Sequence, residues 1–401
     1  MATGKKIRVL IADDSAFMRK VLQSIIASDS QMEVVGEARD GKECVAQAEA
    51  LKPDVITMDI NMPHMDGLQA TEIIMSSNPR PVLIVSSESR DGADTTLKAL
   101  ELGAIDFVAK PSSGIDLDMN SVREELGRKL RMAAKVRVVR TATRSKLQQE
   151  VASAAPRTDP ALKMAQADAA SAAAGSSAAA LRYKPAVSAA SMVVPAPAAA
   201  KGEGRSPIVV VASSTGGPAT LMKFVPMFSR NFPGIVLIAQ HMPGNFTGQF
   251  SKQLAEASAI RVKEAETGET PQPGTVYICP GSHHLRLSSS GRITLDDGPR
   301  ISGYRPCADL ALETAATYAG AMTIGVVLTG MGNDGSRGVQ AVKNAGGWVI
   351  VQDESTSVIF GMPSEAIKTG AVDQVLPIEN IYSAIEKRVL YVHGAVRVGA
   401  L

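Results

Sequence analysis

Short apolar runs alternate with helix-like segments twice along the 401-residue chain, and this alternation constrains the fold more than any other feature. The first series occupies residues 7–108, and the second begins at residue 208. Short strands that alternate with helices of roughly 10–15 residues are typical of βαβ units and a parallel sheet. The sequence therefore predicts the α/β class, with two doubly wound parallel-sheet domains. Ligands of such sheets bind beyond the carboxyl ends of the strands, so polar residues there are the candidates for function.

In the first series, polar residues follow the ends of the strands. Apolar runs lie at 7–12, 34–35, 55–58, 82–85 and 105–108, with helix-like segments at 15–27, 41–50, 67–75 and 94–102. The polar residues at the strand ends are Asp13, Asp14, Asp59, Ser86 and Lys110. Carboxylates that converge at one edge need a cation, and oxygen ligands without His or Cys favour Mg²⁺. A metal-bound carboxylate beside a lysine and a hydroxyl can accept a phosphoryl group. For any single acid the alternative is a helix cap, as Asp14 or Ser15 could provide.

These residues resemble the receiver domain of two-component response regulators. The motifs that carry the resemblance, over about residues 5–125, are Asp13-Asp14, Asp59 with Met62-Pro63 and Asp66-Gly67, Val85-Ser86-Ser87, and Phe107-Val108-Ala109-Lys110-Pro111. The resemblance implies a flavodoxin-like receiver domain at 1–125 with Asp59 as the phosphoacceptor. It implies Mg²⁺ ligands at Asp14, Asp59 and the carbonyl of Asn61, with Asp13 assisting through water. It also implies a switch made of Ser86, Phe107 and Lys110, and a chemotaxis histidine kinase as the phosphodonor.

The composition changes between the two series. Residues 151–200 hold 21 alanines together with Ser and Pro, and the few bulky apolar side chains form no periodic face. Such a segment buries too little apolar surface to offset its chain entropy. We predict an Ala/Pro/Ser-rich linker at 126–205 that is mostly disordered from about residue 135, although its Ala-rich parts could form transient helices.

The second series opens with a run at 208–211 and a turn that contains Ser213, Ser214 and two glycines before Pro218. Pro218 suits the first turn of a helix, where its missing N–H costs nothing. Free N–H groups at a helix start beside a serine hydroxyl suit an oxyanion or a phosphate. An ordinary Gly-rich turn is the plainer alternative.

Two further polar residues follow strands of this series, namely His241 after the run 235–239 and Asp334 after the strand 323–328. The strand-end rule places them on one edge with the serines. A histidine can take the proton of a serine, and a carboxylate on its other ring nitrogen fixes the tautomer. We predict Ser214 as nucleophile, His241 as general base and then acid, and Asp334 as the orienting group.

The oxyanion-hole candidates are the backbone N–H groups of Thr215, Gly216 and Met331. Some alternatives stay open, because Ser213 competes for the role of nucleophile, and His241 or Asp334 alone could be ordinary loop residues. The adjacent His283 and His284 point to opposite faces of a strand, so we expect no zinc site there and no cofactor in this domain. The order Ser, His, Asp differs from that of the α/β-hydrolases, and a G-x-S-x-G pattern is absent.

The second series resembles the catalytic domain of the chemotaxis protein-glutamate methylesterases of the CheB type. The motifs that carry the resemblance are Ala212-Ser213-Ser214-Thr215-Gly216-Gly217-Pro218, Gln240-His241-Met242-Pro243, Tyr277-Ile278-Cys279-Pro280-Gly281, Leu328-Thr329-Gly330-Met331-Gly332-Asn333-Asp334-Gly335 and Phe360-Gly361-Met362-Pro363. One departure is Ala212-Ser213, where members of the family often carry Gly-Ala. The resemblance implies a methylesterase domain at 206–395.

The activity implied by the resemblance is hydrolysis of glutamyl methyl esters, and deamidation of glutamines, on chemotaxis receptors as part of adaptation. Phosphorylation of the receiver domain would raise that activity, by moving the receiver domain off the active-site edge. Two other functions remain as alternatives. One is a phosphorylation-dependent binding regulator without catalysis, and the other is a serine hydrolase that acts on a small ester.

Charge and cysteine content exclude several classes of protein. The net charge of +2 and the lack of a helix-turn-helix pattern in the second domain argue against a nucleic-acid partner. Three scattered cysteines argue against a disulfide scaffold and favour a reducing compartment. We see no signal peptide and no apolar run of about 18 residues, so we expect a cytoplasmic protein without membrane insertion.

Overall fold

The computed structural model describes residues 5–86, 90–110, 119–136 and 205–398. The described residues up to 136 and those from 205 onward belong to one compact unit. The predicted linker falls outside the described residues from 137 to 204, as do Ser87 and Pro111 of the receiver motifs.

The first sheet has five parallel strands in the order β2-β1-β3-β4-β5, which is the flavodoxin-like order. The strands are β1 Ile7–Ala12, β2 Met32–Ala38, β3 Val55–Met58, β4 Val82–Ser86 and β5 Asp106–Ala109. The helices are α1 Ala16–Ala27, α2 Gly41–Leu51, α3 Gly67–Ser77, α4 Arg90–Glu101 and α5 Met119–Ala133. This topology confirms the predicted fold of the first series.

Local sequence explains where several of these helices begin. The side chains of Ser15, Asp40 and Asp66 accept hydrogen bonds from backbone N–H groups in the first turns of α1, α2 and α3. Such caps satisfy donors that have no partner within the helix. The cap by Ser15 agrees with one of the sequence alternatives, and it leaves the neighbouring Asp14 exposed at the edge of the sheet.

The second sheet has seven parallel strands in the order β14-β13-β12-β6-β7-β9-β8. The strands are β6 Ile208–Ser213, β7 Ile235–Gln240, β8 Arg261–Glu264, β9 Thr275–Ile278, β12 Thr323–Val327, β13 Trp348–Gln352 and β14 Gln374–Leu376. All residues of β6 and β7 are buried, as expected for central strands covered on both faces. An antiparallel hairpin, β10 His284–Leu287 and β11 Ile293–Asp296, forms a separate two-stranded sheet.

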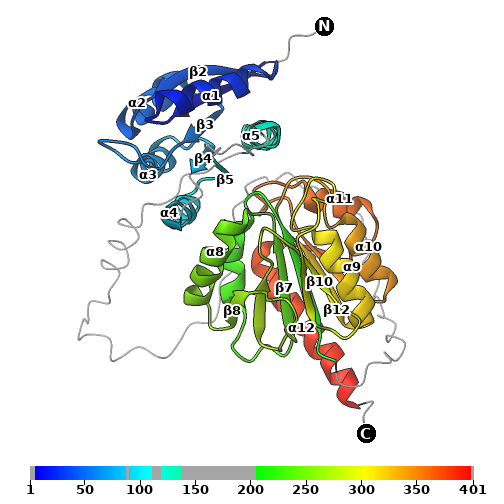
Figure 1. Cartoon of the computed structure of the whole chain (residues 1–401). Helices are drawn as coiled ribbons and strands as arrows, with labels where there is room; N and C mark the ends of the chain where they lie inside the picture. The colour runs from blue at the N-terminus through cyan, green and yellow to red at the C-terminus, as the bar shows by residue number, and fades with distance from the viewer. Residues whose placement is uncertain (1–4, 87–89, 111–118, 137–204, 399–401) are drawn as a thin grey trace, which may run out of the picture. The chain divides into compact units, whose positions relative to one another are not determined.

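Helices cover both faces of this sheet, with α9, α10 and α11 on one side and α8 and α12 on the other (Figure 1). Their bounds are α7 Gly217–Phe224, α8 Gly244–Ala257, α9 Ala308–Ala319, α10 Ser336–Asn344, α11 Met362–Lys368 and α12 Ile378–Val398, with short 3-10 turns η1 Val225–Met227 and η2 Gly320–Met322. The sheet continues beyond β13. The edge strand β14 extends the sheet, but its three residues are too short and too exposed to give an apolar run.

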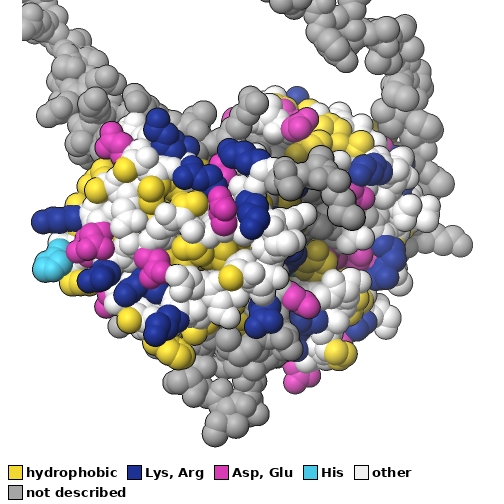
Figure 2. All heavy atoms as spheres, turned by 90° about the horizontal axis from the view of Figure 1, so that it is seen from above, with side chains coloured by type: hydrophobic (Ala, Val, Ile, Leu, Met, Phe, Trp, Pro, Cys, Tyr) yellow, Lys and Arg dark blue, Asp and Glu magenta, His cyan; other side chains and the backbone are white. Residues whose placement is uncertain are grey.

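The face of the molecule shown in Figure 2 is mixed in charge. On the face seen in Figure 2, basic and acidic side chains lie side by side, with hydrophobic side chains scattered between them. Among the described residues, no helix combines the length and the apolar character that crossing a bilayer requires.

Candidate active site

Three adjacent strands bring Ser214, His241 and Asp334 to the same edge of the second sheet. Strand β6 lies between β12 and β7 in the sheet. Ser214 follows β6, His241 follows β7, and Asp334 lies in the loop between β12 and α10. Because the strands are parallel and paired residue by residue, their carboxyl ends open onto one edge. The structure thus brings the three residues together from positions up to 120 residues apart in the chain.

A hydrogen bond joins the side chains of His241 and Asp334. Nε2 of His241 lies 2.8 Å from Oδ2 of Asp334, and the aspartate is 3% exposed. A carboxylate accepts only, so Nε2 carries the proton, and Nδ1 is the nitrogen with the free lone pair. Nδ1 is buried and has no hydrogen-bond partner among the residues that the structure describes. This nitrogen is therefore the one available to take a proton from a serine.

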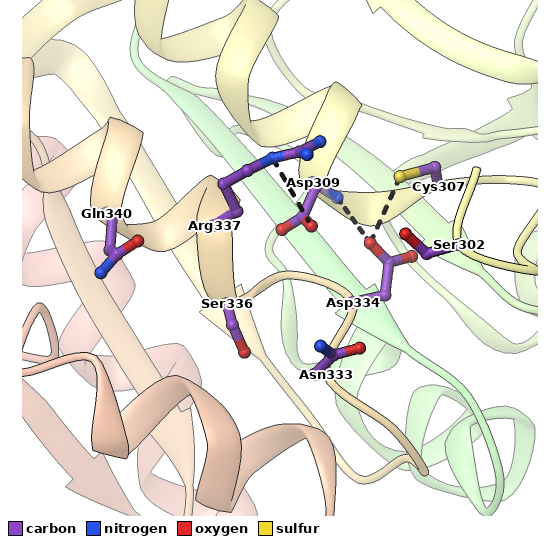
Figure 3. Close-up of a pocket in the computed structure, with 8 residues that line it drawn as sticks. All are labelled: Ser302, Cys307, Asp309, Asn333, Asp334, Ser336, Arg337 and Gln340. Carbon is purple, nitrogen blue, oxygen red and sulfur yellow. Dashed lines mark hydrogen bonds and ion pairs between the residues drawn. The ribbon is translucent and has the colours of Figure 1, made fainter.

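The Asp334 carboxylate also occupies the N-terminus of α9. It accepts hydrogen bonds from the backbone N–H groups of Ala308, at 2.7 Å, and Asp309, at 2.9 Å. The thiol of Cys307 donates to the same carboxylate at 3.3 Å (Figure 3). Burial alone would raise the pKa of Asp334, but the bonds from His241 and from the helix N-terminus outweigh it and hold the pKa below the usual 3.8. Asp334 is therefore ionised at neutral pH, as an orienting group must be.

Asp309 is a functional neighbour that sequence reasoning missed. Its carboxylate accepts from the backbone N–H groups of Gly335, at 2.9 Å, and Gly338, at 2.7 Å, at the start of α10. Asp309 and Asp334 thus line the same cavity, of about 280 Å³, and Arg337 reaches toward Asp309 at its wall (Figure 3). Within a helix, an aspartate has no local signature for such a role, because its partner belongs to a distant loop.

The same corner holds three groups that could in principle ligate a metal. Donor atoms of Cys307, Asp309 and Asp334 lie within 4.8 Å of one another. The helix N–H groups that bond to both carboxylates already account for this arrangement. Burial raises the pKa of the Cys307 thiol to about 12, so the thiol is neutral at physiological pH.

The two candidate serines have different surroundings. Ser213 is fully buried, and its hydroxyl donates to Oε1 of Gln240 at 2.7 Å. Nε2 of Gln240 in turn donates to the backbone carbonyls of Ser214, at 3.0 Å, and His241, at 2.9 Å. The Ser213 hydroxyl is thus part of the framework that ties β6 to β7. Ser214 is 7% exposed and is the first residue beyond β6, at the open edge of the sheet. Its position therefore favours it over Ser213 as the reactive group.

The oxyanion-hole candidates lie on the two loops that meet at Ser214. Thr215 and Gly216 lead into α7, and Met331 follows Gly330 in the loop after β12. The loops are joined by hydrogen bonds from Ser214 N to Thr329 O, at 3.1 Å, and from Thr329 Oγ1 to Thr215 O, at 3.0 Å. A Cβ on Gly330 would lie 2.9 Å from Cβ of Ser214, so this glycine permits the close approach.

A tyrosine that the sequence pattern does not single out packs on the histidine. The ring of Tyr304 stacks on the ring of His241, with centroids 4.4 Å apart and an interplanar angle of 16°. Tyr304 lies in the loop between β11 and α9, where the sequence shows neither an apolar run nor a helix pattern. Only proximity in the folded chain identifies it.

In the receiver domain, Lys110 lies between two of the predicted acids. Its Nζ is 2.9 Å from Oδ2 of Asp13 and 2.9 Å from Oδ2 of Asp59. Burial alone would lower the pKa of Lys110, but these two ion pairs outweigh it and raise the pKa above 10.5. Burial raises the pKa of Asp59, and Lys110 offsets part of that effect.

The predicted metal ligands of the receiver domain suit a hard cation. Carboxylate oxygens of Asp13, Asp14 and Asp59 lie within 4.8 Å of one another, and all are the oxygen donors that Mg²⁺ prefers. Asn61 is exposed in the loop after β3. Ser86 ends β4 and donates to Gly92 O at 3.3 Å, and Phe107 is buried in β5. The structure therefore places the predicted receiver residues at strand ends or in loops of one sheet, except Phe107, which lies within β5.

Comparison with known proteins gives matches over nearly the whole chain. A family model described as CheB methylesterase matches residues 209–385, and one described as response regulator receiver domain matches residues 9–123. A protein-glutamate methylesterase/protein-glutamine glutaminase of Pyrococcus abyssi is 42% identical over 400 residues, which cover 99% of this chain and 97% of the relative. One of Thermotoga maritima is 42% identical over 378 residues, covering 94% and 96%. The crystal structure of the T. maritima CheB methylesterase catalytic domain is 44% identical with a TM-score of 0.44, and covers 46% of this chain and 98% of that one.

Proposed function

Because this chain belongs to the family of protein-glutamate methylesterases/protein-glutamine glutaminases, we propose that it performs this activity with Ser214, His241 and Asp334 as its catalytic groups. The observation that carries the assignment is the bond between Nε2 of His241 and Asp334, which leaves Nδ1 free at the sheet edge that Ser214 occupies. The substrates in this proposal are glutamyl methyl esters and glutamines of methyl-accepting chemotaxis receptors.

The reaction follows from the protons that these groups can hold. Nδ1 of His241 accepts the hydroxyl proton as Oγ of Ser214 attacks the ester carbonyl, and Asp334 stabilises the imidazolium that forms. His241 then gives the proton to the leaving methoxide, so methanol departs and a glutamyl-serine ester remains. Water attacks this ester with His241 again as base, which releases glutamate and restores Ser214. Deamidation follows the same path, with ammonia as the leaving group.

Negative charge develops on the carbonyl oxygen during attack, and backbone N–H groups are its natural stabilisers. We assign this role to the N–H groups of Thr215, Gly216 and Met331, because they lie on the two loops joined at Ser214. Such donors cost no reorganisation, since the helix start and the loop already fix them.

The proposed domain division is a receiver domain at 1–125, a linker at 126–205 and a catalytic domain at 206–395. The chemotaxis histidine kinase is the proposed phosphodonor and Asp59 the phosphoacceptor. Asp13, Asp14, Asp59 and Asn61 would hold Mg²⁺, which offsets charge on the phosphoryl oxygens when bound. Lys110 would exchange its pairing with Asp59 for the phosphoryl group, and Ser86 and Phe107 would respond to the change.

Two contacts made by residues of β5 support control of the active site by the receiver domain. Oγ1 of Thr215, the residue after the proposed nucleophile, donates to Oδ2 of Asp106 at 2.7 Å. The ring of Phe107 packs on Phe246 of α8, with centroids 4.5 Å apart. Asp106 and Phe107 belong to the strand that leads to Lys110, so a change at the phosphorylation site could loosen these contacts.

The decisive test is methanol release from methylated receptor membranes, with and without a small phosphodonor and Mg²⁺. Ser214→Ala should lower the rate by a factor on the order of 10⁴ to 10⁶. Ser213→Ala should keep much of the activity, and Asp59→Asn should lose only the stimulation. A Ser214→Ala protein as active as the wild type would reject the assignment. A soluble ester hydrolysed faster than the receptor would favour the small-ester alternative.

A cytoplasmic location is part of the proposal. Its support is that Cys44, Cys279 and Cys307 are all free and buried, which suits a reducing compartment. The mixed surface charge seen in Figure 2 suits protein partners rather than nucleic acid.

A further inference from the structure

We propose that Tyr304 is a positioning residue for the reaction, which holds the imidazole of His241 in the plane that directs Nδ1 into the active site. The inference rests on the proposed function, because it takes His241 as the base. It assigns a role to the one aromatic ring that stacks on His241 among the described residues.

The hydrogen bond from Nε2 to Asp334 cannot orient the imidazole by itself. A single bond of 2.8 Å fixes the position of Nε2 but leaves the ring free to turn about the line that joins the two atoms. A ring stacked at 4.4 Å and 16° removes this freedom, because turning would break the face-to-face contact. The direction of Nδ1 is thus set by Asp334 and Tyr304 together.

Tyr304 is itself held by backbone contacts on two sides. Paired hydrogen bonds between Ile301 and Tyr304, at 3.0 Å and 2.9 Å, close the tight turn that presents the ring. On the other side, a Cβ on Gly332 would lie 2.0 Å from the Tyr304 hydroxyl. Gly332 belongs to the loop that carries Asp334, so the ring lies against both the base and the segment that orients it.

The chemistry of the ring suits support of the base rather than proton transfer. Burial raises the pKa of Tyr304; Arg128 offsets part of this rise and the negative charge of Asp334 adds to it, so the hydroxyl stays neutral and protonated at physiological pH. The π face of a neutral aromatic ring attracts a cation, and His241 becomes a cation as Ser214 attacks. Stacking therefore favours the transition state over the resting enzyme, and its loss should lower kcat more than it raises KM.

The test compares Tyr304→Leu with Tyr304→Phe in the methanol-release assay. Tyr304→Leu removes the aromatic face, so kcat should fall roughly threefold to thirtyfold with KM near that of the wild type. Tyr304→Phe keeps the face and should restore kcat. The inference is overturned if Tyr304→Leu retains full kcat, if Tyr304→Phe is impaired as much as Tyr304→Leu, or if the whole effect lies in KM.

A second pair of variants tests the position of the ring without changing it. Gly332→Ala should push the tyrosine away from its place and lower kcat. Gly370→Ala is the matched control, because both glycines have positive φ, 91° and 72°, but a Cβ on Gly370 meets nothing within 4 Å. Gly370→Ala should keep the wild-type kcat. Equal kcat in the two variants would contradict a role for the position of Tyr304.

Two controls distinguish a positioning role of Tyr304 from a regulatory role and from failure of the proposed function. The guanidinium carbon of Arg128, a residue of α5, lies 5.9 Å from the centroid of the Tyr304 ring. Because α5 packs with the receiver sheet, each variant is measured with and without phosphodonor. The loss of kcat should be the same in both states, and a loss confined to the unphosphorylated state would assign Tyr304 to regulation instead. Ser214→Ala is assayed alongside. If it remains active, the proposed function fails, whereas an inactive Ser214→Ala beside a fully active Tyr304→Leu removes only the positioning role of Tyr304.

Discussion

Asp309 and Asp334 each cap the helix that begins beside the other. Asp334 lies just before α10, yet its carboxylate accepts from the first N–H groups of α9. Asp309 lies in the first turn of α9, yet its carboxylate accepts from Gly335 and Gly338 at the start of α10. This exchange of caps joins the two helix starts. The loop that carries Asp334 is therefore anchored twice, by the Asp334 side chain to α9 and by the Gly335 backbone to Asp309.

Replacement of Asp309 by alanine should therefore reduce both stability and activity. Loss of a capping side chain costs about 1 kcal/mol of unfolding free energy. Activity should fall further than this, because the Gly335 backbone next to Asp334 loses its anchor. Asp309→Asn is the matched control, since both bonds end on Oδ1 and an amide oxygen in the same place can still accept them. Urea unfolding and methanol release check the pair, and an Asp309→Ala protein with wild-type values for both would contradict the interlock.

The stability of the catalytic domain should depend on Asp334 in acid. Its pKa in the folded protein lies below 3.8, so the unfolded chain binds a proton at a higher pH than the folded one does. The stabilising contribution is complete above the unfolded value and disappears as the pH falls through the folded value. The difference in unfolding free energy between wild type and Asp334→Asn should thus shrink between about pH 5 and pH 2. A difference that stays constant over this range would show that the carboxylate is not specifically stabilised.

Cys307 should behave as a neutral hydrogen-bond donor rather than as a reactive thiol. Its pKa is raised to about 12 by burial and by Asp334, so iodoacetamide should not label it in the native protein at pH 8. Cys307→Ser should preserve activity, because a hydroxyl can donate to Asp334 and serine suits the start of a helix. Cys307→Val should cost up to about 1 kcal/mol through the lost bond. Rapid labelling, or equal stability of the two variants, would count against a donor role for this thiol.

Gly330 should be essential to the position of Ser214. A Cβ at Gly330 would lie 2.3 Å from the sulfur of Met362 and 2.9 Å from Cβ of Ser214, so the nucleophile would have to shift. A displacement of about 1 Å can cost roughly 100-fold in rate, and Gly330→Ala should lose kcat on that scale. Gly325→Ala, in strand β12 that leads to this loop, serves as the control, because its Cβ would come no nearer than 3.2 Å to any side chain, the end of Leu312 being the nearest. Similar activities for the two variants would remove Gly330 from the catalytic geometry.

The parts of the site that lie on strand ends could be predicted from the sequence. Apolar runs identify buried parallel strands, and their carboxyl ends meet at one edge, so the neighbourhood of Ser214, His241 and Asp334 follows from chain order alone. The same rule anticipated Asp13, Asp59 and Lys110 in the receiver domain.

The supporting residues Asp309 and Tyr304 could not be predicted, because no local sequence pattern indicates their contacts. Asp309 resembles an ordinary first-turn helix residue, and Tyr304 lies in the irregular loop between β11 and α9. Both contact residues that are distant in the sequence. The packing of α9 and of the loop 297–307 determines which residues they contact. Strand β14 was not predicted for a different reason. Its three residues are too few and too exposed to give an apolar run in the sequence.

The bridge made by Gln240 also bears on how the enzyme should fail under heat. One amide side chain bonds to Ser213, to the carbonyl of Ser214 and to the carbonyl of His241, across the seam between the two central strands. The backbones that lead into Ser214 and His241 are therefore held by the pairing of β6 with β7, and paired strands lie about 4.8 Å apart. On warming, this spacing should therefore be lost only when the pairing of β6 and β7 is lost. The working lifetime of the enzyme at high temperature should equal the lifetime of the sheet.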